Sequence, residues 1–173
     1  MSKILPDRVR GQRIAVAKSF GLSNVDTIAA AAIEVGFPFY AACALFEKES
    51  MGRNCYGHDK GGALSGFELP VTKDNYAVFR WLVLEKGQLS NGVGPSQITF
   101  KGYFTDMERK GLKPYDVHDN MVYGLTILLA HYAREKTWLG AGTRYNGAAT
   151  YGVDLAKRVN QWRQRFGISG VVK

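Results

Sequence analysis

Residues 41–50 read Ala41-Ala42-Cys43-Ala44-Leu45-Phe46-Glu47-Lys48-Glu49-Ser50, an apolar run that ends in charged and polar side chains. This run predicts the last turns of a helix, in which each residue is rotated by about 100° from the one before it. Glu49 then projects between Leu45 on one side and Ala42 and Phe46 on the other, whereas Glu47 points elsewhere. Because burial beside apolar side chains raises a carboxyl pKa, Glu49 is the better candidate for a general acid. The alternative is an ordinary solvated Glu at a helix end.

Helical periodicity continues on both sides of this run and predicts a mainly α protein with about seven helices. We expect helices at residues 7–19, 28–35, 38–50, 72–85, 105–110, 119–132 and 155–166. Asn24 or Asp26 can cap the second of these helices, Thr72 or Asp74 can start the fourth, and Asp119 can cap the sixth. Long Gly-rich loops at 52–70, 88–99 and 139–150 separate them, with at most a small β element between 54 and 100. The helix at 119–132 is apolar around most of its circumference, so we expect it at the centre of the core.

The composition is that of a single globular domain of 173 residues, with 46% hydrophobic and 22% charged residues. We expect one domain over 1–173, with its core at about 22–167 and a tail or linker at 168–173. The net charge is +8, which favours attraction to polyanions such as nucleic acid, anionic lipid or an anionic cell wall. The basic residues that concentrate this charge near the two ends are Lys3, Arg8, Arg10, Arg13, Lys18, Lys157, Arg158, Arg163, Arg165 and Lys173.

Several kinds of site and segment are not expected from this sequence. Cys43 and Cys55 allow either one disulfide or two free thiols. His58 lies close to Cys55, but no second ligand cluster accompanies them, so we expect no metal and no other cofactor. Residues 1–8 are too polar for the apolar core of a signal peptide, and no run reaches the ~20 apolar residues of a membrane span. We therefore expect synthesis in a cytoplasm and no stable membrane insertion.

Three motifs follow one another along the chain: Glu49-Ser50, then Asn91-Gly92-Val93-Gly94-Pro95-Ser96-Gln97-Ile98-Thr99, then Arg144-Tyr145-Asn146-Gly147. In this order they resemble the lysozyme-like superfamily, in particular goose-type lysozymes and soluble lytic transglycosylases. Those proteins have a Glu-Ser at a helix end, a Gly-Leu-Met-Gln-type loop and an Ala-Tyr-Asn-x-Gly segment. Over a wider stretch, the chain resembles even more closely the lysozyme-like domain of endolysins from phages of actinobacteria. The resemblance covers about residues 38–166 and implies a lysozyme-like fold.

The chain departs from the family pattern at three places. The loop Gly92-Val93-Gly94-Pro95-Ser96-Gln97 replaces the four-residue Gly-Leu-Met-Gln loop. Arg144 stands where the family has Ala, and Ala148 stands where it has the Gly that follows Tyr-Asn. These differences leave open the contacts with individual sugars and the choice between a hydrolase and a transglycosylase.

Cleavage of a glycosidic bond needs a proton for the leaving oxygen and stabilisation of an oxocarbenium-like charge. The resemblance implies that Glu49 is the acid. Asp59, ten residues further on, is the candidate for a second catalytic carboxylate or, alternatively, the cap of an Asx turn. Lytic transglycosylases of the family work with one Glu, since the 6-hydroxyl of the sugar itself closes onto C1. The other implied substrate-binding residues are Ser50, Gln97, Tyr145 and Asn146, of which Ser50 would orient Glu49 or cap its helix.

The sequence therefore predicts a peptidoglycan-degrading glycosidase that cleaves the β-1,4 bond between N-acetylmuramic acid and N-acetylglucosamine. The alternatives are a lytic transglycosylase, a chitinase, or a non-catalytic module that binds cell wall or chitin. A small DNA-binding protein is disfavoured because no recognition motif accompanies the charge. By resemblance to phage endolysins, we expect a monomer made in the host cytoplasm. It would reach the bacterial wall through a membrane lesion made by another phage protein and would bind peptidoglycan and anionic wall polymers.

Overall fold

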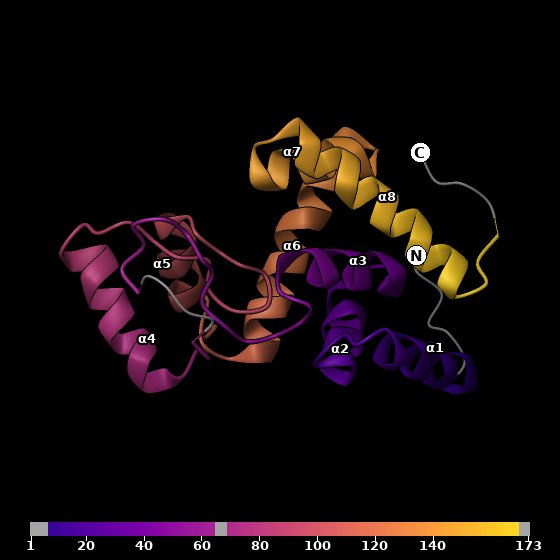
Figure 1. The fold of residues 1–173 in the computed structure, drawn as a ribbon, viewed down its shortest axis with the longest axis horizontal. Coiled ribbons are helices and arrows are strands. Elements are labelled where there is room, and N and C mark those ends of the chain that lie inside the picture. The colour runs from indigo at the N-terminus through magenta and orange to yellow at the C-terminus, as the bar shows by residue number, and fades with distance from the viewer. Residues whose placement is uncertain (1–6, 65–68, 170–173) are drawn as a thin grey trace.

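The computed structural model describes residues 7–64 and 69–169, and its fold is mainly helical (Figure 1). In the described ranges the β structure consists of isolated bridges, such as those of Val93 with Tyr56 and Ile98. The helices are α1 (Asp7–Ser19), α2 (Val25–Val35), α3 (Phe39–Glu49), α4 (Lys73–Arg80), the π-helix η1 (Trp81–Glu85), α5 (Lys101–Arg109), α6 (Val117–Glu135), α7 (Trp138–Asn146) and α8 (Ala149–Arg165). The mainly α class expected from the sequence is confirmed.

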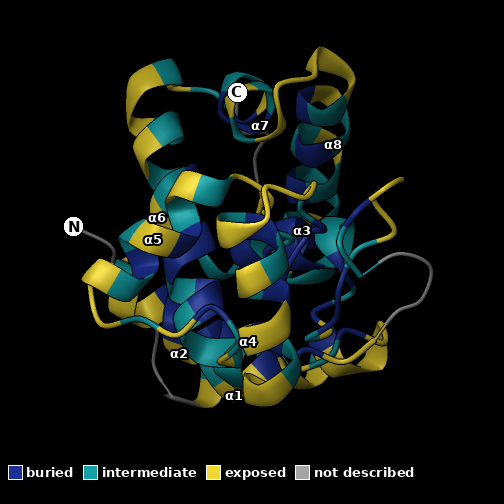
Figure 2. Cartoon of the chain, turned by 90° about the vertical axis from the view of Figure 1, so that its left-hand side faces the viewer, coloured by how far each residue is buried: buried dark blue, intermediate teal, exposed yellow. Residues whose placement is uncertain are grey.

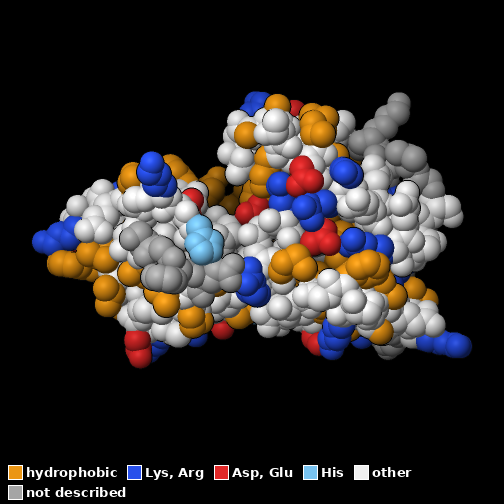
Figure 3. Space-filling model, viewed as in Figure 1, with side chains coloured by type: hydrophobic (Ala, Val, Ile, Leu, Met, Phe, Trp, Pro, Cys, Tyr) orange, Lys and Arg blue, Asp and Glu red, His pale blue; other side chains and the backbone are white. Residues whose placement is uncertain are grey.

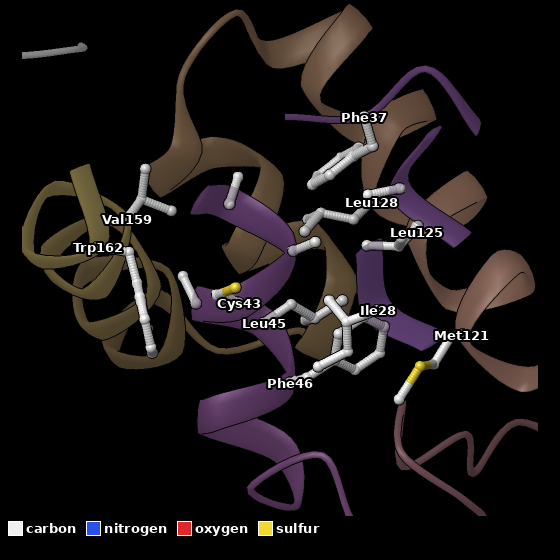
Figure 4. Close-up of a cluster of buried hydrophobic side chains, with 14 of the residues drawn as sticks. Ile28, Phe37, Cys43, Leu45, Phe46, Met121, Leu125, Leu128, Val159 and Trp162 are labelled. Carbon is white, nitrogen blue, oxygen red and sulfur yellow. The ribbon is translucent and has the colours of Figure 1, made fainter. Parts of the chain in front are cut away.

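The larger of two hydrophobic cores is built around α3. Six consecutive residues of this helix, 41–46, are each at 0% exposure, so α3 is enclosed on all sides at its middle (Figure 2). Figure 4 shows Val159 and Trp162 of α8 on one side of α3, with Leu125 and Leu128 of α6 on the other. Burial of this apolar surface is the main force that holds α3 in place.

The smaller core is rich in aromatic side chains and lies with α4 and α5, on the opposite side of α6 from α1 and α2 (Figure 1). Phe79 of α4 and Phe104 of α5 meet edge to face at 5.6 Å between ring centroids. Tyr56, from the loop after α3, packs against Phe79. Tyr123 of α6 enters this core, while Leu125 enters the larger one. Helix α6 therefore joins the two parts of the molecule.

The structure corrects the prediction of a loop at 139–150, because α7 occupies most of that segment. Thr137 caps α7 by accepting a hydrogen bond from the Gly140 N–H at 3.0 Å, and Trp138 is buried. The glycines that suggested a loop serve close helix packing instead. A side chain at Gly142 would lie 3.0 Å from the Cα of Gly152 in α8, so Gly142 brings the two backbones together.

Several helix boundaries also differ from the expected ones. Helix α6 begins at Val117 because Asp116, rather than Asp119, caps it by accepting from the two N–H groups of residues 118 and 119. Helix α5 starts four residues before the expected position. Helix α2 begins at Val25, directly after Asn24, which is one of its two expected caps, although the Asn24 side chain makes no capping hydrogen bond. Helix α4 is capped by Thr72, one of its two expected caps, in a reciprocal pair with Asn75. Helix α1 has the predicted bounds.

Other expectations concern the cysteines, the membrane and the chain ends. Cys43 and Cys55 are both buried free thiols. Within the described ranges, no helix has the length and apolar character needed to cross a bilayer. Lys3, Lys173 and residues 170–173 of the expected tail lie outside the described residues.

Candidate functional site

A cleft of about 340 Å³ lies where the end of α3, two loops and the end of α7 meet. Figure 3 shows the surface hollowed at its upper centre, between the part with α4 and α5 and the part with α7 and α8. The residues that line the cleft are Glu49, His58, Asp59, Gly92, Gln97, Thr99, Tyr145 and Asn146. The fold therefore brings together five of the six residues predicted from sequence, from three separate segments of the chain.

Glu49 is the last residue of α3, and its side chain faces this cleft. Burial raises the pKa of its carboxyl from 4.5 to about 7 because the charged form loses its hydration. The hydrogen bond that the Tyr151 hydroxyl donates to Oε1 and the charge of Lys48 lower this pKa, and the charge of Asp59 raises it. A large part of the Glu49 population therefore carries a proton at neutral pH, as a general acid requires.

Glu47, two residues earlier, is bound inside the protein and does not line the cleft. Its carboxylate accepts hydrogen bonds from Arg158 at 2.9 Å, Arg165 at 2.8 Å and the indole N–H of Trp162 at 3.2 Å, all in α8. Its side chain is only 10% exposed. The two glutamates thus differ as the helical projection predicted, since Glu47 ties α3 to α8 and Glu49 faces the cleft.

Asp59 lies in the loop after α3, and its side chain connects that loop to the second Gly-rich loop. Its Oδ2 accepts a hydrogen bond from the Gly92 N–H at 2.6 Å. Its side chain is exposed to the cleft, and its negative charge acts on Glu49. Asp59 is therefore oriented across two loops, and both carboxyl groups line the same cavity.

The side chain of Gln97 is held in place by hydrogen bonds within the protein. Its side-chain NH₂ donates to the carbonyls of Cys55 at 3.1 Å and Gly94 at 2.9 Å. The amide oxygen lies against Gly57 and Gly92, where a Cβ would collide with it. The backbone of Gln97 is in the left-handed region, at φ 49. Since the NH₂ group is already bonded within the protein, the amide oxygen is the atom of Gln97 most suited to meet a ligand.

Tyr145 and Asn146 reach the cleft from the C-terminal end of α7 rather than from a loop. The Tyr145 hydroxyl donates to the carbonyl of Ser96 at 3.0 Å, so its hydrogen is already used within the protein. Ser50 does not line the cleft, and it takes one of the two roles expected of it, the cap of its helix. Ser50 is buried, caps α3 and donates through Oγ to the carbonyl of Pro95 at 3.0 Å. It therefore positions the end of α3 against the second loop.

Sequence reasoning missed Tyr151, which contacts the candidate acid directly. Its ring stacks with that of Tyr145 at 6.2 Å between centroids, and the Lys48 ammonium lies 4.3 Å from its centroid. Asp154 holds Lys48 in turn, at 2.5 Å. A signal was present, because the apolar stripe of the last helix, Leu155 and every third or fourth residue after it, extends back by four positions to Tyr151.

Comparisons of the chain with protein families, curated proteins and solved structures found no match. Among the described residues, no group of three or more His, Cys, Asp or Glu side chains is placed to hold a metal ion.

Proposed function

We propose that this protein is a peptidoglycan-degrading glycosidase with a lysozyme-like fold, in which Glu49 is the general acid. The bond cleaved would be the β-1,4 bond between N-acetylmuramic acid and N-acetylglucosamine. The observation that carries the proposal is a carboxyl group with a pKa of about 7 in a cleft that also holds Asp59. Two carboxyl groups in different environments are the usual arrangement for glycoside cleavage.

In this mechanism Glu49 gives its proton to the glycosidic oxygen while the bond from that oxygen to C1 breaks. Positive charge develops on the sugar ring, where the negative charge of Asp59 favours it. Glu49 is then a carboxylate, and the Tyr151 hydroxyl already donates to its Oε1, which favours the charged form. In hydrolysis, water adds to C1 and its proton returns to a carboxylate, which leaves a reducing sugar end.

A lytic transglycosylase is the second candidate, since the same acid would serve both reactions. The 6-hydroxyl of the muramic acid would add to C1 in place of water and give an anhydro product. Asp59 favours hydrolysis because an oriented carboxylate in the cleft can activate a water molecule. Its Oδ2 is oriented by Gly92.

The wider biological setting follows from the resemblance to phage endolysins described above. In that setting the chain is released to the bacterial wall at the end of infection and degrades it. The net charge of +8 would favour association with anionic wall polymers, in a salt-dependent manner. We propose no cofactor for this reaction, because an acid, a second carboxylate and water or a sugar hydroxyl are sufficient.

The pH dependence of activity tests the role of Glu49 without a mutation. Since the acid must be protonated, kcat/KM on peptidoglycan fragments is expected to fall above about pH 7, following the pKa of Glu49. The rate should fall about tenfold for each further pH unit. A rate that stays constant up to pH 9 would contradict the assignment.

The decisive experiment is mass spectrometry of purified peptidoglycan after digestion by the wild type and by Glu49→Gln. Reducing muropeptides from the wild type alone would support a hydrolase that uses Glu49, and products lighter by one water would identify a transglycosylase. The matched control is Glu85→Gln, at a glutamate whose side chain is 60% exposed on η1, and it should digest normally. Equal digestion by the Glu49 variant would exclude this acid. Binding without products from the wild type would favour a non-catalytic wall-binding module.

A further inference from the structure

Phe100 is an exposed aromatic residue beside the cleft that the proposed reaction does not use. It is 63% exposed and directly follows Thr99, which lines the cleft. A single exposed apolar side chain is ordinary on a protein surface. Phe100 differs in its place next to the cleft and in the way its ring is held.

The ring of Phe100 is held by two neighbours. It meets the ring of Tyr103 edge to face, at 5.1 Å between centroids and 79° between planes. It also lies against Gly102, where a Cβ would be only 2.7 Å from the Phe100 ring. The glycine thus leaves the space that the ring occupies, and Tyr103 supports it. An aromatic ring held in this way loses little conformational entropy when a ligand binds.

Tyr103 connects this ring to the wall of the cleft. It packs against Tyr123 of α6 at 5.7 Å between centroids. It also lies close enough to Tyr145 that its charge contributes to the raised pKa of the Tyr145 hydroxyl. Since Tyr145 and Thr99 both line the cleft, the Phe100–Tyr103 pair lies next to two of its lining residues, and the end of the cleft beside Thr99 is the one that Phe100 can reach. Figure 3 shows hydrophobic side chains at the back of the hollow.

We propose that Phe100 forms an additional sugar-binding position at this end of the cleft, where its ring stacks on the apolar face of a pyranose in the glycan strand. This inference rests on the proposed function and extends it to a substrate longer than the pair of sugars at the cleaved bond. A pyranose suits both surfaces, because its C–H groups match an aromatic face and its hydroxyls match the polar cleft lining.

Binding can be measured apart from cleavage by isothermal titration calorimetry in the Glu49→Gln background. The ligands are peptide-free oligomers of alternating N-acetylglucosamine and N-acetylmuramic acid, from two to six sugars long. Phe100→Ala is expected to weaken binding of the hexamer about tenfold, or ~1.4 kcal/mol, and to leave the dimer unchanged. Phe100→Trp, which keeps an aromatic face, should retain hexamer affinity. The control Trp81→Ala removes another exposed aromatic side chain, on η1, which has no cleft-lining residue next to it in the chain, and should change neither affinity.

Two results would overturn the inference alone: equal hexamer affinity with and without the Phe100 ring, or an equal loss for the dimer and the hexamer. Both leave the proposed function intact, because the cleft still binds the glycan. If the Glu49→Gln protein and the wild type bind no oligomer of any length, the proposed function fails together with the inference. A circular dichroism spectrum of each variant establishes that the helices are intact.

Discussion

Replacing Glu49 by Gln is expected to stabilise the protein at neutral and alkaline pH while it removes the proposed acid. Burial raises the pKa of this carboxyl from 4.5 to about 7 in the folded protein, whereas the unfolded chain keeps the ordinary value. Between these two values the folded protein binds more protons than the unfolded chain, so its free energy of unfolding falls as the pH rises. Below pH 4.5 Glu49 is neutral in both the folded and the unfolded protein, so the free-energy cost of burying its charge is absent.

The magnitude follows from the two pKa values. A change from 4.5 to about 7, at ~1.36 kcal/mol for each pKa unit, corresponds to about 3 kcal/mol lost by pH 8. Gln carries no charge at any pH, and its side-chain oxygen can still accept the hydrogen bond from Tyr151. The variant should therefore gain about 3 kcal/mol over the wild type at pH 8 and little at pH 4. For a chain of this length that gain raises Tm by roughly 6–12 °C.

The assay is urea unfolding of both proteins at pH 4 and pH 8, followed by circular dichroism. Glu85→Gln, at a carboxylate that is 60% exposed, serves as the matched control for the change in net charge, and its effect is subtracted. The reasoning would be refuted if the Glu49 variant had the same advantage at both pH values, or if it were less stable than the wild type at pH 8. Either result would mean that the Glu49 carboxylate is well solvated in the cleft.

Three further predictions concern neighbouring residues. Tyr151→Phe removes the hydrogen bond that lowers the pKa of Glu49, so the alkaline limb of the kcat/KM profile should move to higher pH; an unchanged limb would show that the hydroxyl does not act on the acid. Glu47→Gln leaves two arginines of α8 without their carboxylate. It should lower the free energy of unfolding in urea by about 2–4 kcal/mol. A loss below about 0.5 kcal/mol would contradict the role of Glu47. Gly92→Ala places a Cβ against the Gln97 amide and should lower kcat/KM about tenfold or more, with little change in Tm; wild-type kinetics would show that the Gln97 position is not needed.

The helix that ends at Glu49 illustrates what could be predicted from local pattern. Its apolar run and the rotation of about 100° per residue separated Glu49 from Glu47, and the structure gives the two side chains different partners. The order of the three motifs also indicated which loops belong together. Cap residues such as Thr72 were recognisable because their hydrogen bonds are made within one turn.

Helix α7 illustrates what local pattern did not reveal. Its glycines are typical of a loop, and only the packing against α8 explains why Gly142 belongs to a helix. The hydrogen-bond partners of Ser50 and Gln97 lay beyond local pattern for a similar reason. Their side chains bind backbone carbonyls of distant segments, at Pro95 and Cys55, and no spacing along the chain predicts such partners.

The sequence by itself determined the mainly helical class and the different faces of Glu47 and Glu49, because both depend on periodicity within a few residues of one helix. Only the tertiary structure decided the properties of the cleft. The pKa of Glu49 depends on how far the folded protein excludes water from it and on the Tyr151 hydroxyl, 102 positions away in the chain. Asp59 and Gly92 meet for the same reason, since Tyr56 and Val93 of their two loops pack in the smaller core and pair in a β-bridge. Burial and long-range contacts are properties of the whole fold, whereas helical periodicity is a property of each segment.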